Sequence, residues 1–254
     1  MYLTEKHIIK KSNKLYKEID ELTFLSKNLY NSALYAIRQH YFETKKYLNY
    51  NAVNRLFIDT NQQDYIKLPR KVSNHVLQQV DKSFKSFFML LQTKNLNGKP
   101  KIPKYKAKIT GRNILSYELG AISYKELKNG FIKLSGTEIK IPFKNIDKGK
   151  LKEVRIVPCL LSYKIEIIYD VIEQPLKTNN NKIAIDLGIN NLCTITNNIH
   201  QKYLIINGKP IKSINQFYNK KLAEYKSNLP KNVYTSNKIK KLTEKRNNKI
   251  KCEM

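Results

Sequence analysis

Apolar residues recur at three- and four-residue steps in two stretches of the first hundred residues. The first runs from about Asn13 to Tyr50, with apolar positions at Leu15, Ile19, Leu22, Leu25, Leu29, Ala33 and Ile37. The second follows Ser73, a residue type that commonly caps helices, and contains Val76, Val80, Phe84, Phe87, Phe88 and Leu91. This spacing predicts two long amphipathic helices, and residues 92–98 close the helical block.

Shorter segments with strand-like patterns flank this helical block. Residues 1–11 alternate apolar and basic side chains and predict one edge strand. Residues 131–134 and 138–143 predict a hairpin around a Ser-Gly turn, and residues 154–157 and 163–169 predict two further strands. Together these segments indicate a small antiparallel barrel or a curved sheet.

A separate block begins after Asn179–Asn181, a polar run that marks a domain boundary. Ile183–Ile185 is apolar on both faces, which is typical of the central strand of a sheet that is covered on both sides. Residues 192–196 and 202–206 predict two more strands of this block.

The charge of the chain indicates a polyanionic partner. The chain has 48 Lys and Arg against 20 Asp and Glu, a net charge of +28, which is far more than solubility requires. Lysines that neutralise phosphates release counterions, so nucleic acid is the natural partner. The 17 tyrosines suit stacking on bases, although AT-rich codon usage explains their number equally well.

Other features of the composition exclude several classes of protein. Cys159, Cys193 and Cys252 form no CxxC pair, so we expect neither a disulfide framework nor zinc. No apolar run approaches the roughly 18 residues of a membrane span, and the N-terminus does not resemble a signal peptide. We therefore expect a cytoplasmic, nucleoid-associated protein with no membrane partner and no small-molecule substrate.

The stretch from Gly98 to Lys108 is basic and punctuated by prolines, so it cannot form a regular helix. Its cations alternate with apolar or aromatic residues. The stretch is either a solvated linker or a strand or loop laid along a nucleic-acid backbone. In the second case the contacting residues are Lys99, Lys101, Lys104, Tyr105, Lys106 and Lys108.

Two basic helices are predicted near the C-terminus, one from a cap at Ser213 to Asn228 and one capped near Ser236. Residues 205–254 contain 13 Lys and Arg against 3 Glu, a net charge of 13 − 3 = +10. Either a solvated helical hairpin or a surface that faces nucleic acid explains this charge. On the second interpretation the contacting residues are Lys220, Lys221, Lys245 and Arg246.

Asp186 is the candidate catalytic and metal-binding residue. It ends the apolar strand that begins at Ile183 and precedes Gly188. A buried carboxylate needs a neutralising partner, and Mg²⁺ is one. The pattern is typical of the first strand of ribonuclease-H-like nucleases, in which the carboxylate helps to hold two Mg²⁺ ions. Sugar kinases and actin-like ATPases begin similarly, and backbone N–H groups can also satisfy a buried Asp. The later acids, Glu224, Glu244 and Glu253, offer no convincing second ligand.

Four local matches resemble, in order, the OrfB/TnpB proteins of insertion sequences. They are Val80–Phe88, Gly98–Lys106, Ile185–Leu192, and Ile214–Leu222 together with Lys245–Ile250. Members of that family are RNA-guided DNA endonucleases and ancestors of the type V CRISPR effectors. The resemblance implies guide RNA and target DNA as partners. It also implies an Asp-Glu-Asp site on Mg²⁺, of which only Asp186 carries over.

The resemblance also implies an α+β multidomain fold. A wedge-like β-barrel is split by a helical insertion and is followed by the N-terminal part of a RuvC, ribonuclease-H-like α/β domain. The expected boundaries are 1–12 for the first strand of the wedge-like domain and 13–97 for the helical recognition-type insertion. The remainder of the barrel then occupies 98–178, and the partial RuvC domain with its basic helical hairpin occupies 179–254.

Intact relatives continue beyond the second basic helix to the catalytic Glu, a four-Cys zinc ribbon and the last Asp. The sequence is therefore interpreted as a C-terminally truncated TnpB-like protein that binds nucleic acid, does not hold Mg²⁺ stably and does not cut DNA alone. Two alternatives stay open. One is a retained nuclease-dead module that represses or competes with an intact copy, and the other is a decayed reading frame with an unstable product.

Overall fold

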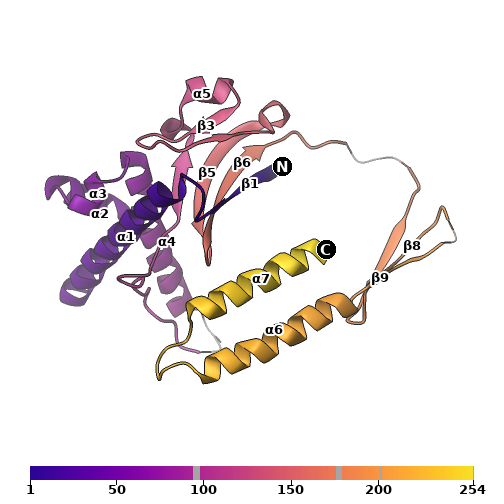
Figure 1. The fold of residues 1–254 in the computed structure, drawn as a ribbon. Coiled ribbons are helices and arrows are strands. Elements are labelled where there is room, and N and C mark those ends of the chain that lie inside the picture. The colour runs from indigo at the N-terminus through magenta and orange to yellow at the C-terminus, as the bar shows by residue number, and fades with distance from the viewer. Residues whose placement is uncertain (94–97, 176–178, 201, 254) are drawn as a thin grey trace. The chain divides into compact units, whose positions relative to one another are not determined.

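The computed structural model describes residues 1–93, 98–175, 179–200 and 202–253. The chain divides into two compact units, Met1–Glu173 and Gln174–Met254 (Figure 1). The predicted boundaries at residues 97 and 178 lie outside the described residues. Among the helices of the described ranges, none combines the length and apolarity needed to cross a membrane.

The first unit contains the predicted helical block, with different helix ends. The helices are α1 (Tyr16–Thr44), α2 (Tyr50–Asp59), α3 (Gln63–Ile66) and α4 (Arg70–Gln92). The apolar stripes of α1 and α4 pack together, as the three- and four-residue spacing predicts, and the central positions of each stripe are buried. Leu91, predicted to end the stripe of α4, is instead 53% exposed. The two short helices between them were not predicted.

The predicted cap at Ser73 is wrong, because α4 begins at Arg70, directly after Pro69. The fixed φ of proline suits a helix start, and no side chain caps the helix there. Ser73 lies inside the first turns of α4, where its buried hydroxyl donates a hydrogen bond to the Tyr65 carbonyl at 2.7 Å. This hydrogen bond ties α4 to α3.

Asp81 of α4 holds the connection between α1 and α2. Its side chain is buried, and Oδ1 accepts hydrogen bonds from the Tyr47 hydroxyl at 2.7 Å and the Tyr50 backbone N–H at 2.9 Å. The Lys85 ammonium lies 2.7 Å from Oδ2. Burial acts to raise the pKa of Asp81, but these three interactions outweigh it and hold the pKa below its ordinary value.

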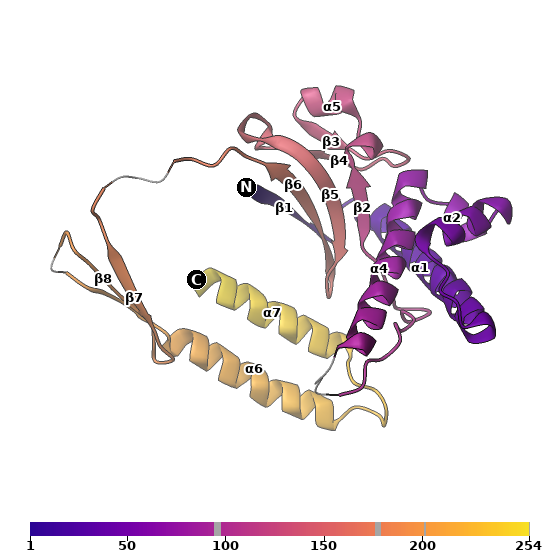
Figure 2. The same ribbon diagram turned by 180° about the vertical axis from the view of Figure 1, so that it is seen from behind.

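A curved antiparallel sheet completes the core of the first unit (Figure 2). Its strands are β1 (Tyr2–Lys10), β6 (Ser162–Asp170), β5 (Lys150–Pro158) and β2 (Leu115–Glu118), in that order across the sheet. Alternate residues of β6 are buried, namely Tyr163, Ile165, Ile167 and Tyr169. β1 lies at one edge of the sheet, as predicted.

The predicted hairpin forms a second, two-stranded sheet from β3 (Phe131–Lys133) and β4 (Lys140–Pro142), in which Ile132 pairs with Ile141. It follows the short helices η1 (Leu119–Ala121) and α5 (Tyr124–Lys128), and η2 (Ile146–Lys148) leads into β5. Of the two predicted alternatives, the barrel is not confirmed and the curved sheet is, because β1 and β2 are the two edges of the four-stranded sheet in the described residues.

The second unit consists of a three-stranded antiparallel sheet and a helical hairpin. The strands β7 (Ile183–Leu187), β8 (Asn191–Asn197) and β9 (Leu204–Asn207) lie in chain order across the sheet. The helices are α6 (Lys209–Ser227) and α7 (Asn237–Glu253). α6 begins four residues before the predicted cap at Ser213, with Pro210 in its first turn. The cap at Ser236 is confirmed, because its hydroxyl accepts the Ile239 N–H.

The prediction that Ile183–Ile185 is a central, covered strand is wrong for the described structure. β7 is an edge strand that pairs only with β8, and Ile183 and Ile185 are 64% and 55% exposed. Apolar residues on both faces of a strand favour burial of both faces, but they do not specify which strands pair with it or what covers it.

Candidate nucleic-acid interface

Asp186 lies on β7 opposite Thr194, and its side chain is exposed rather than buried. The tight turn after it requires Gly188, because a Cβ there would lie 2.8 Å from the Asn191 carbonyl oxygen. Over the described ranges, no three His, Cys, Asp or Glu side chains gather closely enough to hold a metal ion. A two-metal site needs several carboxylates, so the residues around Asp186 do not fit a catalytic Mg²⁺ pair.

The basic segment 98–113 has no regular secondary structure. Side chains of α1 nevertheless form hydrogen bonds with backbone groups of this segment. Asn31 of α1 accepts from the Lys106 N–H and donates to the Lys106 carbonyl, both at 2.9 Å. The buried ammonium of Lys27, one turn earlier, donates to the Lys108 carbonyl at 2.7 Å. Backbone groups fixed in this way do not fit the interpretation of the stretch as a solvated linker.

The C-terminal end of the segment is fixed by an ion pair. The guanidinium of Arg112 binds both carboxylate oxygens of Asp20 on α1, at 3.0 and 2.7 Å. The Tyr163 hydroxyl on β6 also hydrogen bonds to Asp20. The hydrogen bond from Arg112 is the main reason that the pKa of Asp20 is lowered. Burial, reinforced by the bond to Asp20, raises the pKa of Tyr163 to about 12.

The lysine side chains of the segment divide into two groups. Those of Lys99, Lys101, Lys104 and Lys108 are exposed. Lys106 is half-buried, its ammonium lies 4.8 Å from the centre of the buried Tyr30 ring, and burial lowers its pKa. Lys106 therefore packs against α1, and the contact with nucleic acid predicted for it is less favoured than for the four exposed lysines.

Replacing Asn31 with alanine is expected to release the segment, because two backbone groups of Lys106 lose their partners. At about 1 kcal/mol for each hydrogen bond, the undocked population rises roughly 30-fold. Limited trypsin digestion measures this as faster cleavage after Lys104, Lys106 and Lys108. Gln39→Ala, on the same helix, is the matched control, and equal cleavage of the two variants would contradict the docking.

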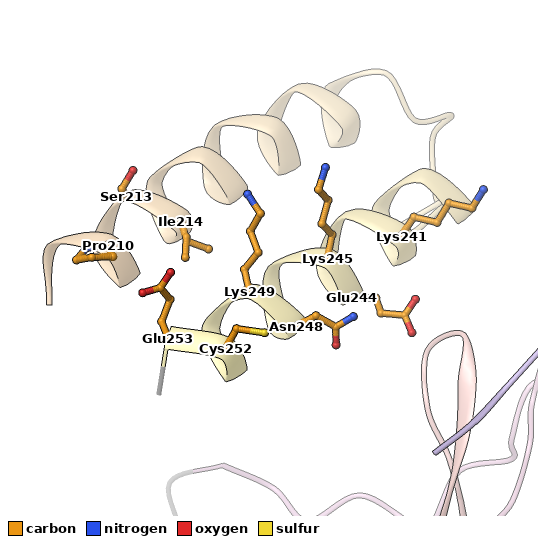
Figure 3. A pocket seen from close by; sticks show the side chains of 10 residues that line it. All are labelled: Pro210, Ser213, Ile214, Lys241, Glu244, Lys245, Asn248, Lys249, Cys252 and Glu253. Carbon is orange, nitrogen blue, oxygen red and sulfur yellow. The ribbon is translucent and has the colours of Figure 1, made fainter. Parts of the chain in front are cut away.

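The basic hairpin of the second unit contains an open groove of about 760 Å³ between α6 and α7. Lys241, Lys245 and Lys249 line it from successive turns of α7 (Figure 3). Pro210, Ser213 and Ile214 of α6 and Glu244 and Glu253 of α7 also line it. Residues four apart on a helix share one face, so these lysines form a single basic stripe.

The other predicted residues of the hairpin have different environments. Lys220 is exposed, and Lys221 pairs with Glu224 at 2.8 Å. The guanidinium of Arg246 donates to the Asn215 amide oxygen at 2.9 Å and lies 5.4 Å from the Tyr218 ring centre. Arg246 therefore joins α7 to α6, and Lys245 faces the groove.

Sequence reasoning missed Lys241 and Lys249 as members of the stripe. Their spacing of four residues on either side of Lys245 is visible in the sequence and was the available signal. It also missed Asn31 and Lys27, which carry no local signal because their partners lie 75 and 81 residues away.

Residues 161–251 match the model of the family OrfB_IS605, described as a probable transposase. This range contains β6 and nearly all of the second unit, including the strand of Asp186 and both basic helices. The predicted resemblance to the OrfB/TnpB proteins is thus confirmed over these residues. No curated protein matches it.

Two solved structures show a distant likeness to the chain. One is a cryo-EM structure of a Cas12f1–sgRNA–target DNA complex, at 14% identity and a TM-score of 0.35, with 97% of this chain and 65% of that chain covered. The other is a CRISPR-Cas12f ternary complex, at 13% identity and a TM-score of 0.36, with 91% and 57% covered. The chain thus spans about 57–65% of those proteins' lengths. Both TM-scores lie below 0.5, so the family match and the geometry carry the interpretation.

Proposed function

We propose that this chain is a nucleic-acid-binding protein that binds guide RNA, target DNA or both, and that the 254-residue polypeptide does not cleave DNA by itself. The observation that carries the binding proposal is the docked basic segment. α1 holds its backbone at Lys106 and Lys108, while the side chains of Lys99, Lys101, Lys104 and Lys108 are exposed. A fixed backbone with free cations presents charge to phosphates at a small cost in conformational entropy.

The family match and the charge of the chain support the same proposal. The matched residues include the lysine stripe of α7, and the whole chain carries a net charge of +28. In the described residues, eight pairs of a Lys or Arg with an Asp or Glu lie within 4 Å of each other, so most of the described Lys and Arg have no acidic neighbour at that distance. Such a surface attracts a polyanion over a long range.

Asp186 supports the proposal of binding without cleavage. In-line cutting of a phosphodiester by two metal ions requires carboxylates that hold both ions. Asp186 supplies one carboxylate from an exposed edge strand, and Glu224 is engaged with Lys221. We expect Mg²⁺ to bind this polypeptide weakly and to contribute little to its affinity for nucleic acid.

Fluorescence anisotropy with labelled single-stranded RNA, single-stranded DNA and duplex DNA tests the binding proposal. We expect submicromolar binding at 0.1 M salt that weakens steeply as salt rises. Binding that is absent, or that is independent of salt, would contradict the proposed function.

Plasmid nicking tests the second part of the proposal. In Mg²⁺, wild-type protein and Asp186→Ala are expected to leave supercoiled plasmid equally intact and to bind the labelled strands equally well. Gel electrophoresis measures the nicked fraction. Cutting by wild-type protein that disappears in Asp186→Ala would show that the polypeptide is a nuclease and refute this part of the proposal.

A further inference from the structure

Three side chains form a cation–aromatic cluster where the docked basic segment crosses α1. The guanidinium carbon of Arg38 lies 5.0 Å from the centre of the Tyr105 ring and 5.7 Å from the centre of the Phe42 ring. Arg38 and Phe42 are four residues apart on α1 and therefore lie on the same face of the helix. Tyr105 comes from the docked segment, directly before the Lys106 backbone that Asn31 holds.

The aromatic side chains of this cluster are partly exposed to solvent. Tyr105 is 44% exposed and Phe42 is 47% exposed, and Tyr35, one turn before Arg38, is 58% exposed. Tyr30 provides the contrast on the same helix, because it is buried beneath the ammonium of Lys106. Tyr30 contributes to packing, whereas the rings beside Arg38 leave apolar surface in water.

The guanidinium of Arg38 also forms no ion pair with another described residue of the chain. In the part of the chain that the structure describes, no carboxylate lies within 4 Å of its guanidinium. An arginine that stacks on aromatic rings without an acidic partner keeps its N–H donors available for a phosphate. The exposed Lys104 and Lys108 flank the cluster in sequence and add two further cations.

We infer that Arg38, Phe42 and Tyr105 form a platform on which an unpaired base of a single-stranded nucleic acid stacks, while the flanking cations contact its phosphates. Aromatic rings beside cations are the general means of binding single strands, because every base has a π-face. The inference rests on the proposed function, since a chain that bound no nucleic acid would have no use for such a platform. Single-stranded RNA and DNA share this chemistry.

A tryptophan in place of Tyr105 reports directly on stacking. The chain contains no tryptophan, so Tyr105→Trp places a single tryptophan, which can be excited selectively over the tyrosines, inside the cluster and preserves an aromatic ring beside Arg38. Tyr124→Trp is the matched control, because Tyr124 is 70% exposed on α5 and also has a cation, Lys128, 4.9 Å from its ring centre. Both variants are titrated with U12, dT12, duplex DNA and a dT12 strand that carries abasic sites.

We expect U12 or dT12 to quench the Tyr105→Trp emission at least twofold, with little change in Tyr124→Trp and little quenching by duplex or abasic strands. The stronger of the U12 and dT12 responses identifies RNA or DNA as the preferred source. Tyr105→Leu and Phe42→Leu are expected to weaken binding of that strand about tenfold, whereas Tyr124→Leu leaves it unchanged.

Anisotropy measured on the same samples distinguishes failure of the stacking platform from failure of the proposed nucleic-acid binding. Tight binding with equal quenching at both positions, or with undiminished affinity for the abasic strand, overturns the platform and leaves the proposed function standing. Failure of wild-type protein to bind any strand overturns both. Circular dichroism of each leucine variant checks that the fold of α1 is retained, so that lost affinity is not mistaken for unfolding.

Discussion

Asp81→Ala is expected to destabilise the helical part of the first unit by about 3 kcal/mol. The substitution removes the acceptor of the Tyr50 N–H and the nearer acceptor of the Tyr47 hydroxyl, which keeps only the Asp81 backbone carbonyl at 3.4 Å. A buried unpaired polar group costs about 1–3 kcal/mol. Because Tyr47 lies in the connection from α1 to α2 and Tyr50 is the first residue of α2, the loss of their hydrogen bonds to Asp81 should also destabilise α4. Amide hydrogen exchange of α4 peptides measures it, with an expected acceleration of about 100-fold.

Two variants show whether the buried hydrogen bonds are responsible. Asp59→Ala removes an exposed carboxylate from α2 and is expected to change stability by less than about 0.5 kcal/mol. Lys85→Ala removes the ion pair but keeps the carboxylate, and its side chain is 65% exposed, so we expect an effect below about 1 kcal/mol. An Asp81→Ala effect as small as either control would refute the role assigned to Asp81.

The lowered pKa of Asp81 determines how the contribution of its carboxylate to folding stability depends on pH. A carboxylate whose pKa is lower in the folded state stabilises the protein above its unfolded pKa of about 3.9. That stability is lost as the pH falls through the lower, folded pKa. Asp81→Asn should therefore approach wild-type stability in acid and fall behind it near neutral pH. A constant difference from pH 7 to pH 2 would contradict the ionised state of Asp81.

The spacing of apolar residues predicted which helices and strands form better than it predicted where they end and what they contact. The apolar steps from Leu15 to Ile37 gave α1, and the alternation after Tyr163 gave β6. Ser73 was mistaken for a cap because a capping residue inside a helix has the same identity, and its partner, the Tyr65 carbonyl, belongs to a helix too short to show a period. The hydrogen bond from Ser73 to Tyr65 joins two helices, and a pattern of neighbouring residues does not predict such a contact.

The candidate interface shows the same limit. The charge and the alternation of cations with apolar residues were evident in the segment from Gly98 to Lys108. The hydrogen bonds between Asn31 and the Lys106 backbone, however, join residues that are 75 positions apart in the sequence. The half-buried state of Lys106 follows from that contact, so sequence could not separate Lys106 from its exposed neighbours. Likewise, β7 was assigned to the sheet correctly, but its place at the edge depends on which strands pair with it.

Replacing Lys241, Lys245 and Lys249 together with glutamine is expected to weaken binding of single-stranded nucleic acid about 100-fold at 0.1 M salt. The three side chains line one groove of α7 at intervals of about 6 Å along the helix axis, so one strand can meet all of them. Each lost phosphate contact removes about 0.7 from the slope of log affinity against log salt, and three remove about 2. Anisotropy titrations at several salt concentrations measure both quantities.

The control must remove the same charge from the same helix. Lys238, Lys240 and Lys251 also belong to α7 but do not line the groove. Their replacement by glutamine lowers the net charge equally, so long-range attraction falls by a similar amount in both variants. A slope change of about 2 confined to the groove variant would place the strand along this stripe. Equal and small changes in the two variants would mean that the hairpin acts only through its overall charge, and that the docked segment on α1 provides the specific contacts.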